Sequence, residues 1–118
     1  MNWVQRQRKG TKLQKLVANI ILRWNPSLEY QDVQSTPMGA NDADIRLSDK
    51  AKKLFPYKVE CKNQQRMKEL WVKFAQAEDH TGAEQPLLVV KRERCPPLAV
   101  VHLEEFIKLV HQSLRNKK

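Results

Sequence analysis

The sequence predicts a mixed α/β domain in which a central mixed sheet is flanked by helices. Three segments repeat apolar residues at the spacing of an amphipathic helix: 13–24, 67–80 and 103–114. Four shorter segments have the alternating or continuously aliphatic pattern of strands: 43–48, 57–62, 87–91 and 98–102. A fifth segment, 28–35, has imperfect alternation and fits a short edge strand. This order of elements predicts one domain spanning residues 1–118.

The composition favours a nucleic-acid partner. The chain has 118 residues, enough to bury roughly two-thirds of the surface that the unfolded chain exposes, so no disulfide or structural metal is required. Its 22 Lys and Arg against 13 Asp and Glu give a net charge of +9, which favours a polyanionic partner. No apolar run approaches the ~18 residues of a membrane-spanning helix, and the start lacks the apolar core of a signal peptide. We therefore expect a cytoplasmic protein with no membrane partner, whose two cysteines are free thiols.

The first 28 residues contain no acid. Residues 1–10 are expected to form a flexible basic arm, followed by a helix over 13–24 that Pro26 terminates. The cations expected to contact DNA phosphates are Arg6, Arg8, Lys9, Lys12 and Lys15. The alternative is a basic helix face that is simply solvated.

Residues 39–63 hold the side chains with the clearest chemical use. Side chains in a strand alternate faces, so Asp44 points away from the core side on which Ala43 and Ile45 lie. The same alternation puts Glu60 and Lys62 on one face. If the two strands are neighbours, two carboxylates suited to Mg²⁺ meet the amino group of Lys62, which can orient or deprotonate the attacking water or stabilise the charged transition state. The alternative is an ion pair between Glu60 and Lys62 on an exposed strand.

The pattern resembles the PD-(D/E)XK nuclease superfamily, in which an acid in one strand precedes Glu-x-Lys in the next. Here Gly-Ala-Asn-Asp-Ala-Asp-Ile over 39–45 is followed by Val-Glu-Cys-Lys-Asn over 59–63. Within that superfamily the chain is most similar to the small archaeal-type Holliday junction resolvases. Those enzymes open with a basic Lys-Gly turn and a helix, as Arg-Lys-Gly over 8–10 does here. The resemblance covers roughly residues 6–94, and nucleases with different substrates share its motifs.

The resemblance implies a restriction-endonuclease-like domain that hydrolyses phosphodiester bonds with Mg²⁺, for which Mn²⁺ should substitute. It implies metal ligation by Asp44, Glu60 and the backbone carbonyl of Cys61, with Lys62 positioning the attacking water. It also implies a homodimer that cuts four-way DNA junctions in a prokaryotic or phage-infected cell. Further residues expected near DNA are Ser35, Thr36, Asn63, Gln64 and Arg66. The alternatives are a nicking, restriction or repair endonuclease and a non-catalytic nucleic-acid-binding module.

The sequence departs from the resolvase pattern at two places. The first helix of those resolvases carries a Glu about four residues after the Gly, where this chain has Gln14, which leaves a third acidic ligand and a second metal ion open. The Pro-Asp pair of the family is replaced by Asn-Asp-Ala-Asp over 41–44, so Asp42 is an alternative ligand. Asp44 is preferred because it directly precedes the apolar strand position Ile45.

Three further expectations concern structure rather than chemistry. Residues 49–53 form a basic turn, and Trp71 and Phe74 belong to the core. The aliphatic strands 87–91 and 98–102 are covered on both faces.

Overall fold

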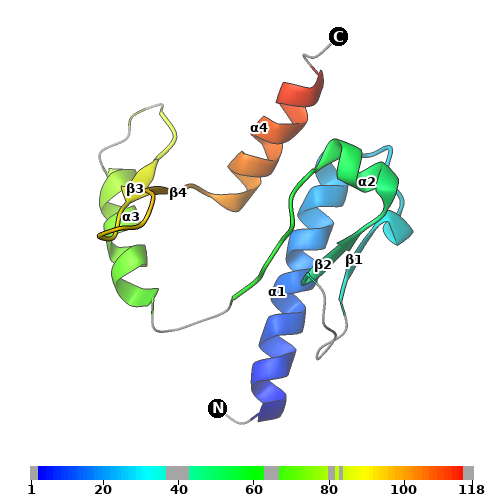
Figure 1. Cartoon of the computed structure of the whole chain (residues 1–118), viewed down its shortest axis with the longest axis horizontal. Helices are drawn as coiled ribbons and strands as arrows, with labels where there is room; N and C mark the ends of the chain where they lie inside the picture. The colour runs from blue at the N-terminus through cyan, green and yellow to red at the C-terminus, as the bar shows by residue number, and fades with distance from the viewer. Residues whose placement is uncertain (1–2, 37–42, 63–66, 80–81, 83, 116–118) are drawn as a thin grey trace. The chain divides into compact units, whose positions relative to one another are not determined.

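The computed structural model describes residues 3–36, 43–62, 67–79, 82 and 84–115, and their side chains from residue 11 onward. These residues form a mixed α/β structure with four α-helices and two small antiparallel sheets (Figure 1). The chain comprises two compact units, Met1–Asn63 with Ile107–Lys118 (unit 1) and Gln64–Phe106 (unit 2). Each described sheet has two strands, whereas the sequence predicted one central mixed sheet. The assignment of residues 1–118 to one domain stays a prediction.

Unit 1 is built on the long helix α1 (Trp3–Trp24). One face of α1 buries Val17, Ala18 and Ile21 against β1, at the spacing expected of an amphipathic helix. The side chain of Asn25 donates to the Ile21 carbonyl at 2.8 Å and so satisfies one of the carbonyls left unpaired at the helix end. The expected flexible arm is wrong for residues 3–10, which are helical. Those residues are mostly good helix formers, and the single Gly10 costs only about 1 kcal/mol within a helix.

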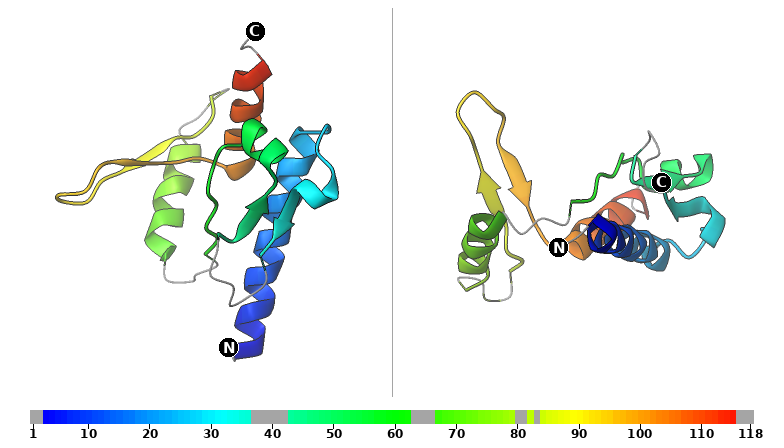
Figure 2. Two further views of the ribbon diagram at one scale, coloured as in Figure 1. Left: turned by 45° about the vertical axis from the view of Figure 1, so that its right-hand side comes forward. Right: turned by 90° about the horizontal axis from the view of Figure 1, so that it is seen from below.

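A short hairpin lies beside α1 in both views of unit 1 (Figures 1 and 2). A 3₁₀ turn, η1 (Tyr30–Asp32), leads into β1 (Val33–Ser35), which pairs antiparallel with β2 (Ile45–Leu47). The strand expected over 28–35 is therefore limited to its last three residues. Val33 and Ile45 are 1% and 3% exposed, so the hairpin and α1 share one apolar layer.

The segment after the hairpin differs in two ways from the sequence prediction. Residues expected to form a basic turn form a short helix, α2 (Asp49–Leu54), because the Ser48 hydroxyl accepts from the amide of Ala51 and caps its start. Residues 57–62 are not a regular strand, although the Asp44 amide donates to the Val59 carbonyl at 3.1 Å. The segment therefore lies next to the chain that enters β2 without a continued ladder of hydrogen bonds.

Unit 2 consists of α3 (Lys68–Asp79) beside the antiparallel hairpin of β3 (Leu88–Val90) and β4 (Leu98–Val100) (Figure 2). Phe74 is buried as expected, but Trp71 is 68% exposed. The expectation that both strands are covered on two faces is also wrong for the described residues, because Val89 is 61% exposed while its neighbours Leu88 and Val90 are half-buried. A two-stranded hairpin beside a single helix has only one covered face.

The last helix is α4 (Leu103–Arg115), as the sequence predicts. Acidic Glu104 and Glu105 lie in its first turn and Arg115 in its last, an order that suits the helix dipole. Ile107 of α4 is fully buried. Of the helices in the described ranges, none is long and apolar enough to cross a membrane.

Candidate active site

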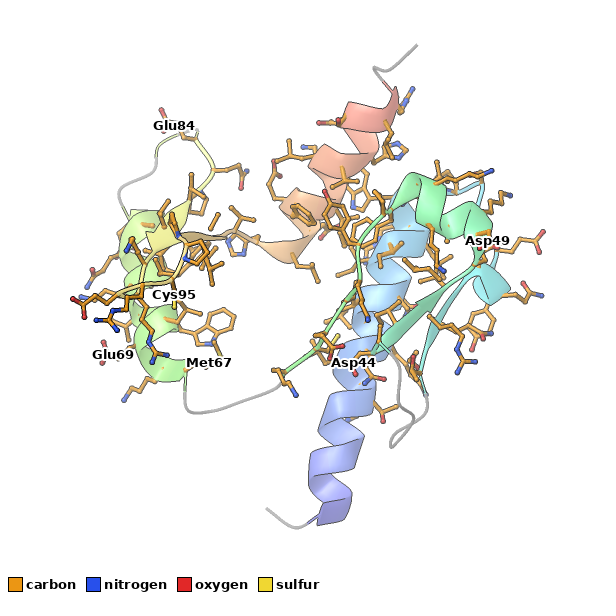
Figure 3. All side chains as sticks on the ribbon, viewed as in Figure 1. Asp44, Asp49, Met67, Glu69, Glu84 and Cys95 are labelled. Carbon is orange, nitrogen blue, oxygen red and sulfur yellow. The ribbon has the colours of Figure 1, made fainter. Side chains whose placement is uncertain are left out.

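Three segments of unit 1 meet at Asp44, which Figure 3 labels where the chain enters β2. The Asp44 carbonyl accepts from the amide of Thr36 at 2.9 Å, and the Asp44 amide donates to the Val59 carbonyl at 3.1 Å. The amide of Cys61 donates to Oδ2 of the Asp44 carboxylate at 2.5 Å. The main chain and the side chain of Asp44 are thus tied to the segment that carries Glu60 and Lys62.

The alternation predicted for both segments is confirmed. Ala43 and Ile45 are 7% and 3% exposed, whereas Asp44 between them is half-buried. Glu60 and Lys62 are exposed, and Cys61 between them is half-buried. The charged side chains therefore lie on the accessible side of their segments although residues 57–62 form no regular strand.

The donors at this point suit a hard divalent cation. Asp44 and Glu60 supply carboxylates, and the Cys61 carbonyl oxygen belongs to the residue whose amide binds Asp44. Mg²⁺ binds through one or two carboxylates and keeps several waters, so two acids are sufficient. Among the described residues, no group of three or more His, Cys, Asp and Glu side chains is arranged to hold a metal. Asp42, the alternative ligand, lies outside the described residues.

Gln14 belongs to the buried face of α1 and is 6% exposed. Its side chain is a neutral amide, which offers one carbonyl oxygen in place of the negative charge of a glutamate. At this position the chain therefore supplies no third acidic ligand.

The two acids influence the ionisation of the Cys61 thiol. Burial is the largest cause that raises the pKa of Cys61, and the negative charges of Asp44 and Glu60 raise that pKa further. The thiol is therefore protonated at neutral pH, and it reports on the charge of both carboxylates.

The residues expected to contact DNA divide into four groups. Lys12 and Lys15 are exposed on α1, as expected. Thr36 is only 5% exposed, and its hydroxyl donates to the Ala43 carbonyl. Its side chain therefore holds the segment that leads into β2 and does not face a ligand. Ser35 is half-buried in β1 opposite Ile45. The side chains of the remaining expected contacts lie outside the described residues: Arg6, Arg8, Lys9, Asn63, Gln64 and Arg66.

Sequence reasoning missed a pocket of about 460 Å³ on the same part of unit 1, called the basic pocket below. Its polar lining comes from β2, α2 and the segment that follows: Arg46, Lys52, Tyr57 and Lys58. Its apolar lining consists of Ala43, Ile45, Leu47 and Pro56. The run of lysines after Ser48 was the available signal, but a run of lysines does not indicate which of them border a pocket.

Searches of protein-family models, of curated proteins and of solved structures found no match to this chain.

Proposed function

We propose that this protein is a Mg²⁺-dependent DNA endonuclease that hydrolyses phosphodiester bonds, with four-way junctions as its preferred substrate. The observation that carries the proposal is the hydrogen bond from the Cys61 amide to the Asp44 carboxylate, which joins the acid to the Glu-x-Lys segment. The net charge of +9 supports a polyanionic substrate. The proposal includes a restriction-endonuclease-like domain, as the sequence resemblance implies.

In the proposed reaction, Asp44, Glu60 and the Cys61 carbonyl would hold the metal ion. A bound Mg²⁺ would offset charge on the scissile phosphate and make hydroxide available near neutral pH. The Cys61 amide donates to Oδ2 of Asp44 and so orients this carboxylate. This arrangement keeps the ligand in place before the substrate arrives, so less reorganisation is needed during the reaction.

Lys62 contributes the positive charge of the site. It is exposed two residues after Glu60, so both side chains project from the same side of the segment. Its ammonium group donates hydrogen bonds to the attacking water and to a phosphate oxygen, and it stabilises the charge that develops as the bond breaks. A guanidinium cannot replace it as a compact donor, so Lys62→Arg should also be inactive.

The junction preference requires a dimer. A four-way junction has near two-fold symmetry and must be cut on two strands, so one site per chain requires two chains. Sedimentation of the free protein at micromolar concentration should therefore give the mass of a dimer. Cleavage of a cruciform in a supercoiled plasmid should give paired nicks that linearise it. A monomer that nicks any duplex equally well contradicts the junction preference and leaves a simpler nuclease.

The activity itself is tested on a panel of four-way, forked, linear and single-stranded DNA with Mg²⁺, Mn²⁺ or a chelator. We expect cleavage with either metal, fastest on the four-way junction, and none with the chelator. Asp49→Asn is the matched control for Asp44→Asn, because Asp49 is an exposed acid in the first turn of α2. Equal cleavage by wild type and Asp44→Asn would overturn the assignment of the site.

A non-catalytic DNA-binding module is the second candidate, because buried Gln14 stands where the resembling resolvases carry an acid. Such a module would bind the same DNA panel with an affinity that Mg²⁺ leaves unchanged, and it would cleave none of the substrates.

A further inference from the structure

The basic pocket has the size and the lining of a small-ligand site. Its volume of about 460 Å³ falls within the ~300–1,000 Å³ typical of such sites. Every described residue that lines it belongs to unit 1. The described lining of the pocket therefore depends on the packing of that unit.

The charge of the pocket selects an anion. Arg46, Lys52 and Lys58 are exposed cations from three different segments, β2, α2 and the chain after Pro56. None of the described lining residues is acidic. In the described part of the chain, no ion pair joins these three cations to a carboxylate. Cations and a planar guanidinium around one pocket are the groups that bind a phosphate.

The remaining lining selects a flat apolar group. Tyr57 is 44% exposed, and its ring packs on Phe55 with the centroids 5.0 Å apart. Phe55 is itself only 3% exposed, so the Tyr57 ring rests on a buried residue while part of it stays accessible. The aliphatic side chains of Ile45 and Leu47 extend this apolar lining. An aromatic ring of this kind stacks on any nucleobase, whatever its identity.

We propose that the basic pocket binds one nucleotide, with its phosphate held by Arg46, Lys52 and Lys58 and its base packed on Tyr57. A free mononucleotide and an unpaired nucleotide within a DNA strand offer the same chemistry. We favour the strand, and this choice rests on the proposed nuclease function. Ala43 and Ile45 of the pocket are the chain neighbours of Asp44, on the opposite side of that segment from its carboxylate, and Lys58 directly precedes Val59, whose carbonyl accepts from the Asp44 amide.

Such a pocket favours DNA that has unpaired nucleotides next to the scissile phosphate. A base inside a duplex must be unstacked and unpaired before it can enter a pocket, whereas an unpaired base at a branch or a gap enters at lower cost. The pocket thus provides a physical basis for a preference for branched over continuous duplex DNA.

The test measures DNA affinity by fluorescence anisotropy in the full-length Asp44→Asn background, without metal, so that cleavage does not interfere. The two ligands are a duplex with a short unpaired bubble and the same sequence fully paired. Tyr57→Leu should weaken bubble binding about tenfold and duplex binding less than twofold, because only the bubble supplies a base for stacking. Tyr57→Phe should retain bubble binding, and Tyr30→Leu is the matched control because Tyr30 is 71% exposed outside the pocket.

Two further variants address the phosphate and guard against misfolding. Lys52→Ala and Lys58→Ala change exposed side chains, and each should weaken bubble binding more than the control Lys73→Ala on α3 does. In a separate arm, NMR follows the Tyr57 ring signals during titration with a deoxynucleoside monophosphate and with inorganic phosphate. Shifts with the mononucleotide but no effect of the variants on DNA would assign the pocket to a free nucleotide.

The outcomes separate this proposal from the nuclease proposal. Equal losses on bubble and duplex, or no loss on either with no mononucleotide shift, would overturn the nucleotide pocket even if the protein cleaves DNA. Selective loss on the bubble in a protein that cleaves nothing would overturn the nuclease and keep the pocket.

Discussion

Asp44 has two separable roles, one in the proposed chemistry and one in the fold. We expect Asp44→Asn, Glu60→Gln and Lys62→Ala each to reduce cleavage by at least about two orders of magnitude while DNA affinity stays within a few-fold. Asp44→Asn keeps an oxygen that accepts from the Cys61 amide, whereas Asp44→Ala loses it. The Ala variant should therefore be inactive and also less stable, by about 1–3 kcal/mol. Denaturant unfolding checks this, and equal stability of the two variants would contradict it.

Cys61 gives a readout of metal binding that does not require cleavage. Thiolates react with alkylating agents and thiols do not, and burial together with the charges of Asp44 and Glu60 raises the pKa of Cys61. Its alkylation should therefore be slow near neutral pH and accelerate as the pH rises towards that elevated pKa. Asp44→Asn removes one negative charge and should lower the pKa and speed alkylation at fixed pH. Mg²⁺ should do the same in the wild type, measured by mass spectrometry of the peptide that contains Cys61.

The residue scale is also where the sequence predicted most. The alternation of Ala43, Asp44 and Ile45 was sufficient to assign their exposure correctly. Alternation along one segment cannot predict which residue of a distant segment a side chain will contact. No acid stands beside His102 in the sequence, yet its Nε2 lies 3.3 Å from the Glu78 carboxylate on α3. That pair depends on the packing of unit 2.

At the scale of elements, Asp32 ties the start of α2 to the turn before β1. Its Oδ1 accepts from the Ser48 hydroxyl at 2.7 Å and its Oδ2 accepts from the Glu29 amide at 2.8 Å. Ser48 in turn caps α2. We expect Ser48→Ala to lower the free energy of unfolding by about 1 kcal/mol, the usual cost of a lost helix cap. The exposed Ser27→Ala serves as a control in a denaturant titration.

The same carboxylate should make stability depend on pH. The hydrogen bonds from Ser48 and Glu29 lower the pKa of Asp32 in the folded chain. The stabilisation is therefore complete above the pKa of an unfolded Asp and is lost as pH falls through the lower folded value. The stability difference between the wild type and Asp32→Asn should shrink across that acidic interval. A difference that is constant from neutral pH down to strong acid would show that ionisation of Asp32 is not involved.

Helices and strands were predicted correctly where a single periodic pattern of apolar residues determines them. The helices α3 and α4 begin and end close to their expected bounds because each has an uninterrupted apolar stripe. Residues 57–62 carry a strand pattern, but a strand also needs a continuous ladder of partners, which is a property of the neighbouring chain. Residues 3–10 of the expected arm are helical because no residue there stops a helix that tertiary packing supports further on.

At the scale of the whole molecule, the excess of 22 basic over 13 acidic residues should govern the salt dependence of DNA binding. Lys12 and Lys15 are exposed, three positions apart on α1, and so lie on one helix face. If each contacts a phosphate, each alanine variant should reduce the slope of log affinity against log salt by about 0.9. Lys108→Ala on α4 is a comparison of equal charge. An unchanged slope in the Lys12→Ala/Lys15→Ala double variant would show that this face is only solvated.

Thr36 makes two hydrogen bonds to the segment that leads into β2. The Thr36 amide donates to the Asp44 carbonyl at 2.9 Å, and the Thr36 hydroxyl donates to the Ala43 carbonyl. Together with the bond to Val59, these hydrogen bonds involve residues on either side of the connection 37–42. Lengthening such a connection costs only about 0.6 kcal/mol for each doubling of its length. Insertions there can alter what the protein recognises while the acid keeps its place, so recognition and chemistry are able to diverge independently between descendants of this sequence.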